Sequence, residues 1–128
     1  MNAIENNAYF WQKIDTLVSS SSFVLLRKKN ESHPQYPNLV YPVMYGYLSD
    51  TKAAGEGINL YKGSLKQQSV QALIVAADIL KKDLEVKLVV GCTEEEEFSI
   101  LQFLNQTDLQ KTILIRRGTD LPSWSVTD

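Results

Sequence analysis

The sequence has few of the features that mark secreted or membrane proteins. It contains one cysteine, Cys92, so no disulfide can form within the chain. No apolar run approaches the roughly 20 residues that a membrane-spanning helix needs. Residues 1–20 lack a basic segment followed by an apolar one, the pattern of a secretory signal. We therefore expect a cytoplasmic protein with no membrane partner.

The chain also has no excess of positive charge. Its 13 Lys and Arg residues are interspersed among 15 Asp and Glu residues, which gives a formal charge of -2. Proteins that bind nucleic acid usually present a basic surface to the phosphates, so we expect no nucleic-acid partner. With a single histidine, His33, and a single cysteine, the chain cannot supply the usual ligands of a zinc site.

The composition is that of an ordinary globular domain. With 128 residues and 44% hydrophobic content, the chain is long enough for one core and too short for two. We expect a single domain over residues 1–118. Residues 119–128, which include Pro122 and Trp124, are expected to form a loose tail.

Two helices are predicted. Apolar residues from Phe10 to Val18 recur at helical spacing, and the helix should end in the serines of residues 19–22. The second helix begins at Thr93, which forms a capping box with Glu96. Its expected apolar positions are Phe98, Leu101 and Leu104. The acidic run of residues 94–97 suits the positive end of this helix dipole better than a cation site.

Short strands are predicted between and after these helices. The segment 58–61 alternates like a half-buried strand, whereas 70–80 and 86–90 suggest strands buried on both faces, with Asp83 in the turn between them. The expected strands are 23–27, 58–61, 70–80, 86–90 and 112–115. Residues 30–42 contain three prolines and should be irregular. The fold class is α+β, a small barrel or strongly bent antiparallel sheet with a helix from each end of the chain packed outside.

An aromatic segment is the strongest candidate for function. Four tyrosines, at positions 36, 41, 45 and 47, lie within twelve residues, and we interpret residues 41–47 as a loop with a tight glycine turn. Tyrosines combine an apolar ring with a polar tip, so they suit either the edge of a core or a ligand site. Glu56 follows in a loop between two glycines.

A second group of polar residues strengthens the ligand-site interpretation. Glu85 and Lys87 are two residues apart in an expected strand, so their side chains point to the same face. Together with Arg27, Glu56 and the phenols they predict a concave site. A nucleophile at Cys92 is a weaker interpretation, because no histidine lies near it in sequence. His33 precedes Pro34 in a proline-rich loop, which suits ordinary loop chemistry better than catalysis.

Three segments resemble the soluble family I inorganic pyrophosphatases. Residues 41–48, YPVMYGYL, are similar to the family's Tyr-Pro-x-Asn-Tyr-Gly-(Phe/Tyr)-Ile. Residues 54–59, AGEGIN, take the place of Asp-Gly-Asp-Pro-x-Asp. Residues 83–88, DLEVKL, are similar to the end of the second acidic motif, Asp followed five residues later by Asp-x-Lys. The resemblance covers roughly residues 23 to 91 and suggests a short pyrophosphatase-like protein.

This resemblance implies a small β-barrel with flanking helices and a magnesium-dependent hydrolysis of pyrophosphate. It assigns Glu56 as general base and metal ligand, and Asn59 and Glu85 as further metal ligands. It places Tyr45 and Lys87 on the phosphates of the substrate, and we expect Arg27 to bind the phosphates with them.

The chain departs from the family where metal ions would bind. Ala54, Asn59 and Leu80 stand where the family has aspartates, so two carboxylates are retained and three are replaced. Mg²⁺ prefers oxygen ligands of high charge, so we expect weak or absent binding and little or no hydrolysis. A shift of the second motif could bring Asp78 or Asp83 into a ligand role. The alternative is a non-catalytic module that binds a phosphorylated small molecule or nucleotide, or a protein; self-association as a homo-oligomer is left open.

Overall fold

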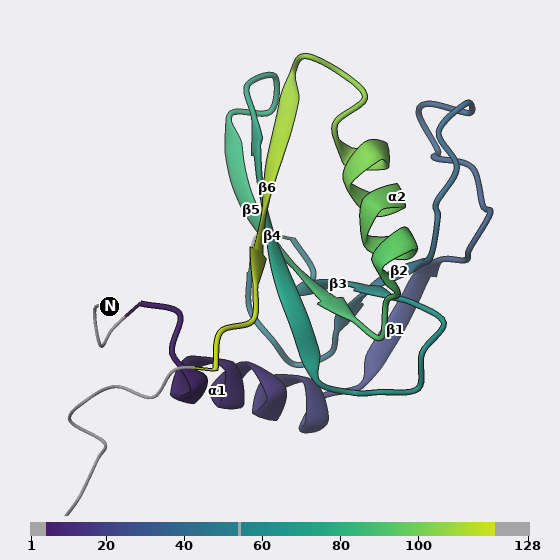
Figure 1. The fold of residues 1–128 in the computed structure, drawn as a ribbon. Coiled ribbons are helices and arrows are strands. Elements are labelled where there is room, and N and C mark those ends of the chain that lie inside the picture. The colour runs from purple at the N-terminus through teal and green to yellow at the C-terminus, as the bar shows by residue number, and fades with distance from the viewer. Residues whose placement is uncertain (1–4, 54, 120–128) are drawn as a thin grey trace, which may run out of the picture.

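The computed structural model describes residues 5–53 and 55–119. These residues form an α+β fold, as predicted, with one six-stranded mixed sheet and two helices (Figure 1). In chain order the elements are α1 (Ala8–Ser19), β1 (Phe23–Arg27), β2 (Met44–Leu48), β3 (Asn59–Lys62), β4 (Val70–Asp78), β5 (Asp83–Val90), α2 (Glu94–Leu104) and β6 (Gln110–Arg116). Ala54 and all of the expected tail except Thr119 lie outside the described residues.

The sheet is open and not purely antiparallel. Its strand order is β1-β2-β3-β5-β4-β6, with β1 and β6 at the two edges. Every neighbouring pair is antiparallel except β3 and β5, which run parallel with Asn59 opposite Lys87. The expected closed barrel is therefore not formed by the described strands, and the alternative of a purely antiparallel sheet is wrong at the β3–β5 pair.

The two helices cover opposite faces of the sheet. In β4, Leu73 packs in one apolar core with Trp11 of α1. Its neighbours Ala72 and Ile74 pack in a second core with Ile100 of α2. Because successive side chains of a strand point to opposite faces, each face of the sheet carries its own core and its own helix. Neither helix of the described chain has the length and apolar character needed to cross a membrane.

Helix α1 confirms the predicted N-terminal helix. Asn7 caps it by accepting a hydrogen bond from the backbone N–H of Phe10 at 3.1 Å. Asp15 holds it to the sheet, since its carboxylate accepts from the backbone N–H of Val70 and from Arg117, both at 2.9 Å. The guanidinium and the Val70 N–H outweigh partial burial and lower the pKa of Asp15.

Helix α2 begins with the predicted capping box between Thr93 and Glu96. The choice of Phe98 as a core residue is wrong, because its side chain is 61% exposed. The buried apolar positions are Ile100, Phe103 and Leu104. The apolar face differs from the expected one because Glu97, in the first turn of α2, is buried and not solvated.

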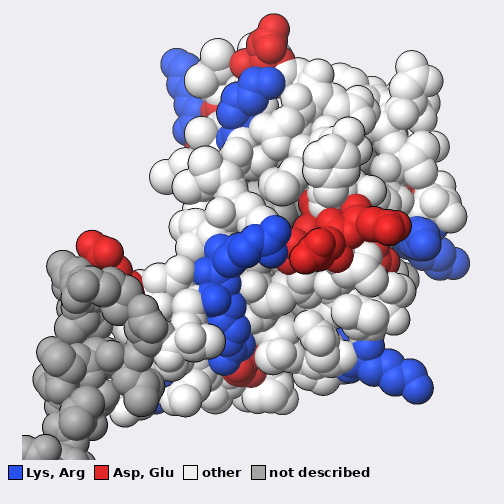
Figure 2. Space-filling view, viewed as in Figure 1, with Lys and Arg blue, Asp and Glu red and all other residues white. Residues whose placement is uncertain are grey.

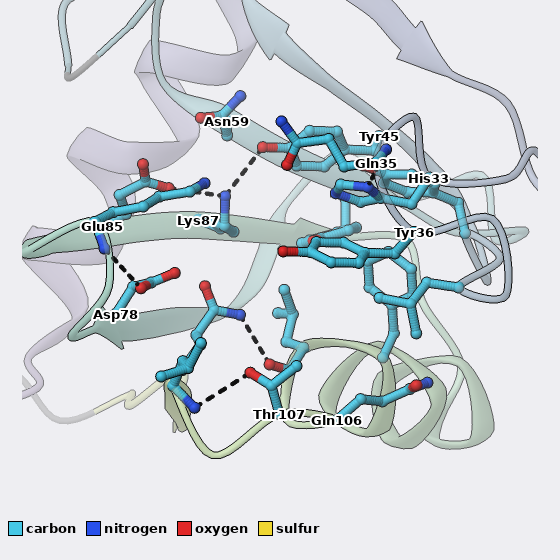
Figure 3. Close-up of a pocket in the computed structure, with 18 of the residues that line it drawn as sticks. His33, Gln35, Tyr36, Tyr45, Asn59, Asp78, Glu85, Lys87, Gln106 and Thr107 are labelled. Atoms are coloured by element: carbon cyan, nitrogen blue, oxygen red, sulfur yellow. Dashed lines mark hydrogen bonds and ion pairs between the residues drawn. The ribbon is translucent and has the colours of Figure 1, made fainter.

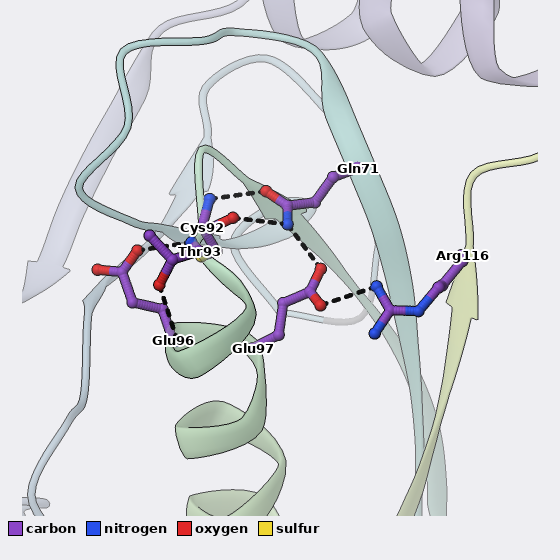
Figure 4. Close-up of polar contacts among 6 residues, drawn as sticks. All are labelled: Gln71, Cys92, Thr93, Glu96, Glu97 and Arg116. Carbon is purple, nitrogen blue, oxygen red and sulfur yellow. Dashed lines mark hydrogen bonds and ion pairs between the residues drawn. The ribbon is translucent and has the colours of Figure 1, made fainter.

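A polar network ties the start of α2 to the sheet (Figure 4). The carboxylate of Glu97 accepts from the side-chain amide of Gln71 on β4 at 2.6 Å and from Arg116 on β6 at 2.8 Å. Gln71 also bonds the backbone N–H and C=O of Cys92. Figure 2 shows acidic side chains gathered at the start of α2, with basic side chains next to them. The acidic residues 94–97 thus form the first turn of α2, and Glu97 joins that turn to the sheet.

The aromatic segment is a strand and not the expected loop. Residues Met44–Leu48 form β2, which pairs with β1 and β3. Gly46 lies within this strand, where a Cβ atom would come to 2.0 Å from the backbone oxygen of Val24. The glycine therefore allows close approach of two strands and does not form a tight turn.

Burial along the other strands differs from the prediction in three places. In the expected buried strand 70–80, β4 ends at Asp78, and Ile79 and Leu80 are exposed. In β3, Leu60 and Tyr61 are both buried, so the expected alternation is wrong. In β5 the second half is buried on both faces, but Leu84 and Val86 in the first half are exposed. Asp83 is the first residue of β5 and does not lie in the turn before it.

Replacing Gly46 with alanine should destabilise the fold by roughly 3 kcal/mol, the upper end of the cost of overpacking, because the clash is with backbone. Gly55→Ala is the matched control. Its Cβ would meet nothing within 4 Å, although the φ of 90° should cost about 1 kcal/mol. Urea denaturation of both variants checks this order; a larger loss in Gly55→Ala would contradict the assignment of Gly46.

The Asp15→Asn variant should lose about 1.5–3 kcal/mol of unfolding free energy at pH 7, because a charged acceptor of two hydrogen bonds becomes neutral. The folded-state pKa of Asp15 lies below its ordinary value of 3.8. Its contribution is therefore present above pH 3.8 and is lost as the pH falls through the folded-state pKa. Denaturation curves of both proteins should converge in acid. Asp108→Asn, at an exposed side chain, should change little at any pH.

Candidate functional site

A cleft of about 470 Å³ lies on the α2 face of the sheet (Figure 3). Its floor comes from β2, β3, β4 and β5, and its walls from the loop of residues 30–42 and the C-terminal end of α2. The polar and charged side chains that line it are His33, Gln35, Tyr36, Tyr41, Tyr45, Glu56, Asn59, Tyr61, Asp78, Lys81, Glu85, Lys87, Gln106, Thr107 and Gln110.

Lys87 is the central residue of the cleft floor. Its side chain comes from the middle of the sheet, and the residue is only 6% exposed. The ammonium group donates to the hydroxyl of Tyr45 at 3.0 Å and to the carboxylate of Glu85 at 3.1 Å. Asn59 faces Lys87 across the parallel pair of strands and donates to the carbonyl of Gly46. A buried cation is thus held by one carboxylate and one phenol.

This arrangement keeps both members of the ion pair charged. Burial alone would raise the pKa of Glu85, but the charge and hydrogen bond of Lys87 outweigh it and lower that pKa. Burial alone would lower the pKa of Lys87, but Tyr45 and Glu85 outweigh it and raise that pKa. At neutral pH the floor therefore presents a fixed positive charge next to a fixed negative one.

The structure brings together most of the site residues predicted from the sequence. Tyr45, Glu56, Asn59, Glu85 and Lys87 all line the cleft, with Glu56 exposed to solvent and Lys87 buried.

Arg27 is the exception. It is not among the side chains that line the cleft; its Nε lies 3.5 Å from the carboxylate of Glu31, and another guanidinium nitrogen donates to the carbonyl of Leu26. The arginine predicted to bind phosphate therefore supports the loop next to the cleft.

The two alternative acidic ligands have different surroundings. Asp78 lines the cleft, but its carboxylate accepts from the backbone N–H groups of Leu80 and Lys81 and so closes the β4–β5 turn. Asp83 pairs with Asp78 across the hairpin. Slight desolvation and then the neighbouring charge of Glu85 raise the pKa of Asp83. Leu80 also lines the cleft.

These side chains do not fit a magnesium site of several ions. In residues 5–53 and 55–119, no three His, Cys, Asp or Glu side chains are grouped closely enough to hold a metal ion. Glu85 faces the ammonium of Lys87, which would repel a cation, and Asn59 is neutral.

Sequence reasoning missed the outer wall of the cleft. His33, which the sequence predicts to be an ordinary loop residue, lines this wall. Its ring stacks on that of Tyr41, with the ring centroids 6.0 Å apart. Burial, together with the charges of Lys81 and Arg27, lowers the pKa of His33, so the ring is neutral at pH 7. Polar groups after α2 complete the wall, and no local pattern marks them, because they reach the cleft only through the packing of α2.

Cys92 does not belong to this site. It is buried at the start of α2, and burial together with Glu96 and Glu97 raises the pKa of its thiol to about 12. Burial and the raised pKa both disfavour a thiolate nucleophile at this position.

Comparisons with protein-family models, with curated proteins and with solved structures give no match for this chain. Its candidate function therefore depends on the geometry of the cleft and on the sequence motifs that line it.

Replacing Lys87 with methionine should raise the pKa of Glu85, because burial then acts without the cation that contributes most to offsetting it. Carboxyl-carbon NMR titration of Glu85 measures this directly. Lys81→Met is the control: Lys81 is exposed and has a smaller effect on Glu85, so the shift should be smaller. Equal shifts in the two variants would contradict the central position of Lys87.

Proposed function

We propose that this cleft binds a phosphorylated small molecule, such as pyrophosphate, and that the chain is a short pyrophosphatase-like protein whose hydrolysis is absent or feeble. The observation that carries the proposal is the buried ammonium of Lys87 at the cleft floor, held by Tyr45 and Glu85. An ammonium has three donors. Two go to these partners, so the third is available to a ligand oxygen.

The arrangement of the three resembling segments supports this proposal. Residues 41–48 include β2, residues 55–59 end at the first residue of β3, and residues 83–88 lie in β5. Tyr45, Asn59 and Lys87 come from these three segments, and all line the same cavity. Segments that are similar to one family's phosphate-handling motifs thus meet at one place. They are distant in sequence, since 42 residues separate Tyr45 from Lys87, which donates a hydrogen bond to it. The described sheet is open, so a pyrophosphatase-like fold is proposed here from the motifs alone.

The same site gives reasons to expect little hydrolysis. The family's reaction needs several magnesium ions to neutralise the diphosphate and to activate water. Here Glu85 is already paired with Lys87, and Asn59 brings an amide where the family has a carboxylate. Glu56 stands at the position of the family's general base, exposed in its loop. If turnover remains, Glu56 accepts the proton of the attacking water.

The other candidate, a purely non-catalytic binding module, uses the same cleft. It is favoured by the ion pair on the floor, which suits recognition of an anion and does not require a metal. Self-association and a cytoplasmic location stay predictions.

Two measurements test the proposal. Calorimetry should detect binding of pyrophosphate by the parent chain, and Lys87→Met should weaken it by about 10- to 100-fold, the loss of a hydrogen bond from a charged donor. Phosphate release from pyrophosphate with Mg²⁺, and then with Mn²⁺, should be at background or slow, and any slow release should vanish in Glu56→Gln.

Lys66→Met serves as control, because Lys66 is exposed and does not line the cleft. Unchanged affinity in Lys87→Met would overturn the proposed binding site. Turnover at the rates typical of enzymes, about 1–10³ s⁻¹, would overturn the expectation of feeble hydrolysis.

A further inference from the structure

We infer that the ligand of this cleft is a nucleoside monophosphate, with its phosphate at Lys87 and its base on the ring of Tyr36. This inference rests on the proposed function, because it takes the Lys87 end of the cleft as the phosphate end. It adds the chemical class of the rest of the ligand. Three observations carry it: the volume of the cleft, its charge balance and its aromatic wall.

The volume is that of a site for an organic ligand. At about 470 Å³ the cleft lies within the range of roughly 300–1,000 Å³ that is typical of pockets for small organic molecules. An inorganic phosphate or diphosphate at Lys87 would contact the floor and leave the outer part of the cleft unfilled. A ligand that also contacts the loop of residues 30–42 and the end of α2 uses the whole site.

The charge balance disfavours a ligand that binds by charge alone. The positively charged side chains that line the cleft are Lys81 and Lys87, and the negatively charged ones are Glu56, Asp78 and Glu85. The lining thus carries one more negative than positive charge. A phosphate monoester brings a charge of about -1.5 to -2, less than a diphosphate does, and so meets less repulsion. Such a ligand needs further affinity from uncharged contacts.

The outer wall offers those contacts. Tyr36 is 50% exposed, and its ring lies 5.2 Å from that of His33 between centroids. Figure 3 shows Tyr36 beside His33, and Gln106 and Thr107 after the end of α2; all four line the cleft. A base has a flat π-face that stacks on such a ring. The amide of Gln106 can donate to and accept from the edge of the base. The hydroxyl of Thr107, which accepts from the backbone N–H of Leu109 at 3.3 Å, can donate to it.

The phosphate end and the base end belong to one continuous row of rings. Tyr45 accepts a hydrogen bond from Lys87, and its ring centroid lies 5.6 Å from that of Tyr41. The ring of Tyr41 stacks on His33, and His33 contacts the ring of Tyr36. The row leads from the buried ammonium to the solvent-exposed mouth. A sugar phosphate alone would occupy only its inner part, so the base is the feature of the ligand that the outer rings select.

Calorimetric titration of the full chain with AMP, ribose 5-phosphate and inorganic phosphate tests the inference. The first two ligands carry the same phosphate monoester, so their difference reports the base. AMP should bind about 5- to 150-fold more tightly than ribose 5-phosphate, the range that corresponds to about 1–3 kcal/mol for one stacked base.

Variants of Tyr36 locate the base. Tyr36→Leu should reduce the ratio of the AMP affinity to the ribose 5-phosphate affinity to about one, whereas Tyr36→Phe, which keeps the ring, should retain it. Asn38→Ala is the control for changes in the loop, since Asn38 is exposed in the same loop and does not line the cleft.

The outcomes separate the two proposals. If ribose 5-phosphate binds through Lys87 and AMP binds no more tightly, the base site is overturned and the proposed function stands. If the preference for AMP survives in Tyr36→Leu, the placement of the base on Tyr36 is wrong. If AMP, ribose 5-phosphate, inorganic phosphate and pyrophosphate all fail to bind, the proposed function falls together with the inference.

Discussion

The need to compensate one buried cation governs the structure of this cleft. An ammonium removed from water is costly unless carboxylates and hydrogen-bond acceptors replace the lost solvent. Lys87 finds them in Glu85, two residues earlier on the same strand, and in Tyr45, two strands away in the sheet. Between those two strands lies β3, so the sheet must hold β2, β3 and β5 in one register for the ammonium to be satisfied. The ion pair at the cleft floor and its contact with Tyr45 follow from this requirement.

Local sequence chemistry predicted the elements that depend on neighbouring residues. The capping box at Thr93 set the start of α2, and the apolar spacing after Phe10 set the extent of α1. Elements that depend on distant contacts were predicted less well. Gly46 looked like a turn residue, but its lack of a side chain serves the approach of Val24 from another strand. Phe98 looked like a core residue because helical spacing alone cannot say which face meets the sheet. Buried Glu97 decides that face, through bonds to residues 26 and 19 positions away.

The site shows the same division. The i, i+2 relation placed Glu85 and Lys87 on one face of a strand, and the motif spacing associated them with Tyr45 and Asn59. All four line one cavity. Arg27 could not be placed in this way, because its neighbour Glu31 competes for its guanidinium. The outer wall of the cleft could not be predicted from the sequence for a different reason. Residues 106, 107 and 110 follow a helix whose docking angle is set by its buried side chains, and nothing in their own sequence indicates that they face a loop some 70 residues earlier.

The parallel pairing of β3 with β5 also bears on the order in which the chain folds. Sheet neighbours β4 and β5 are joined by a short turn, and β1, β2 and β3 follow one another along the chain, so each group can form from contacts between successive strands. The β3–β5 pair is different, because its strands are not successive along the chain: Asn59 meets Lys87 only when the two groups dock. Docking that pairs residues distant in sequence has an entropic cost and is slow to nucleate. We therefore expect the cleft floor to assemble late, so that its residues govern how fast the native state opens more than how fast it forms.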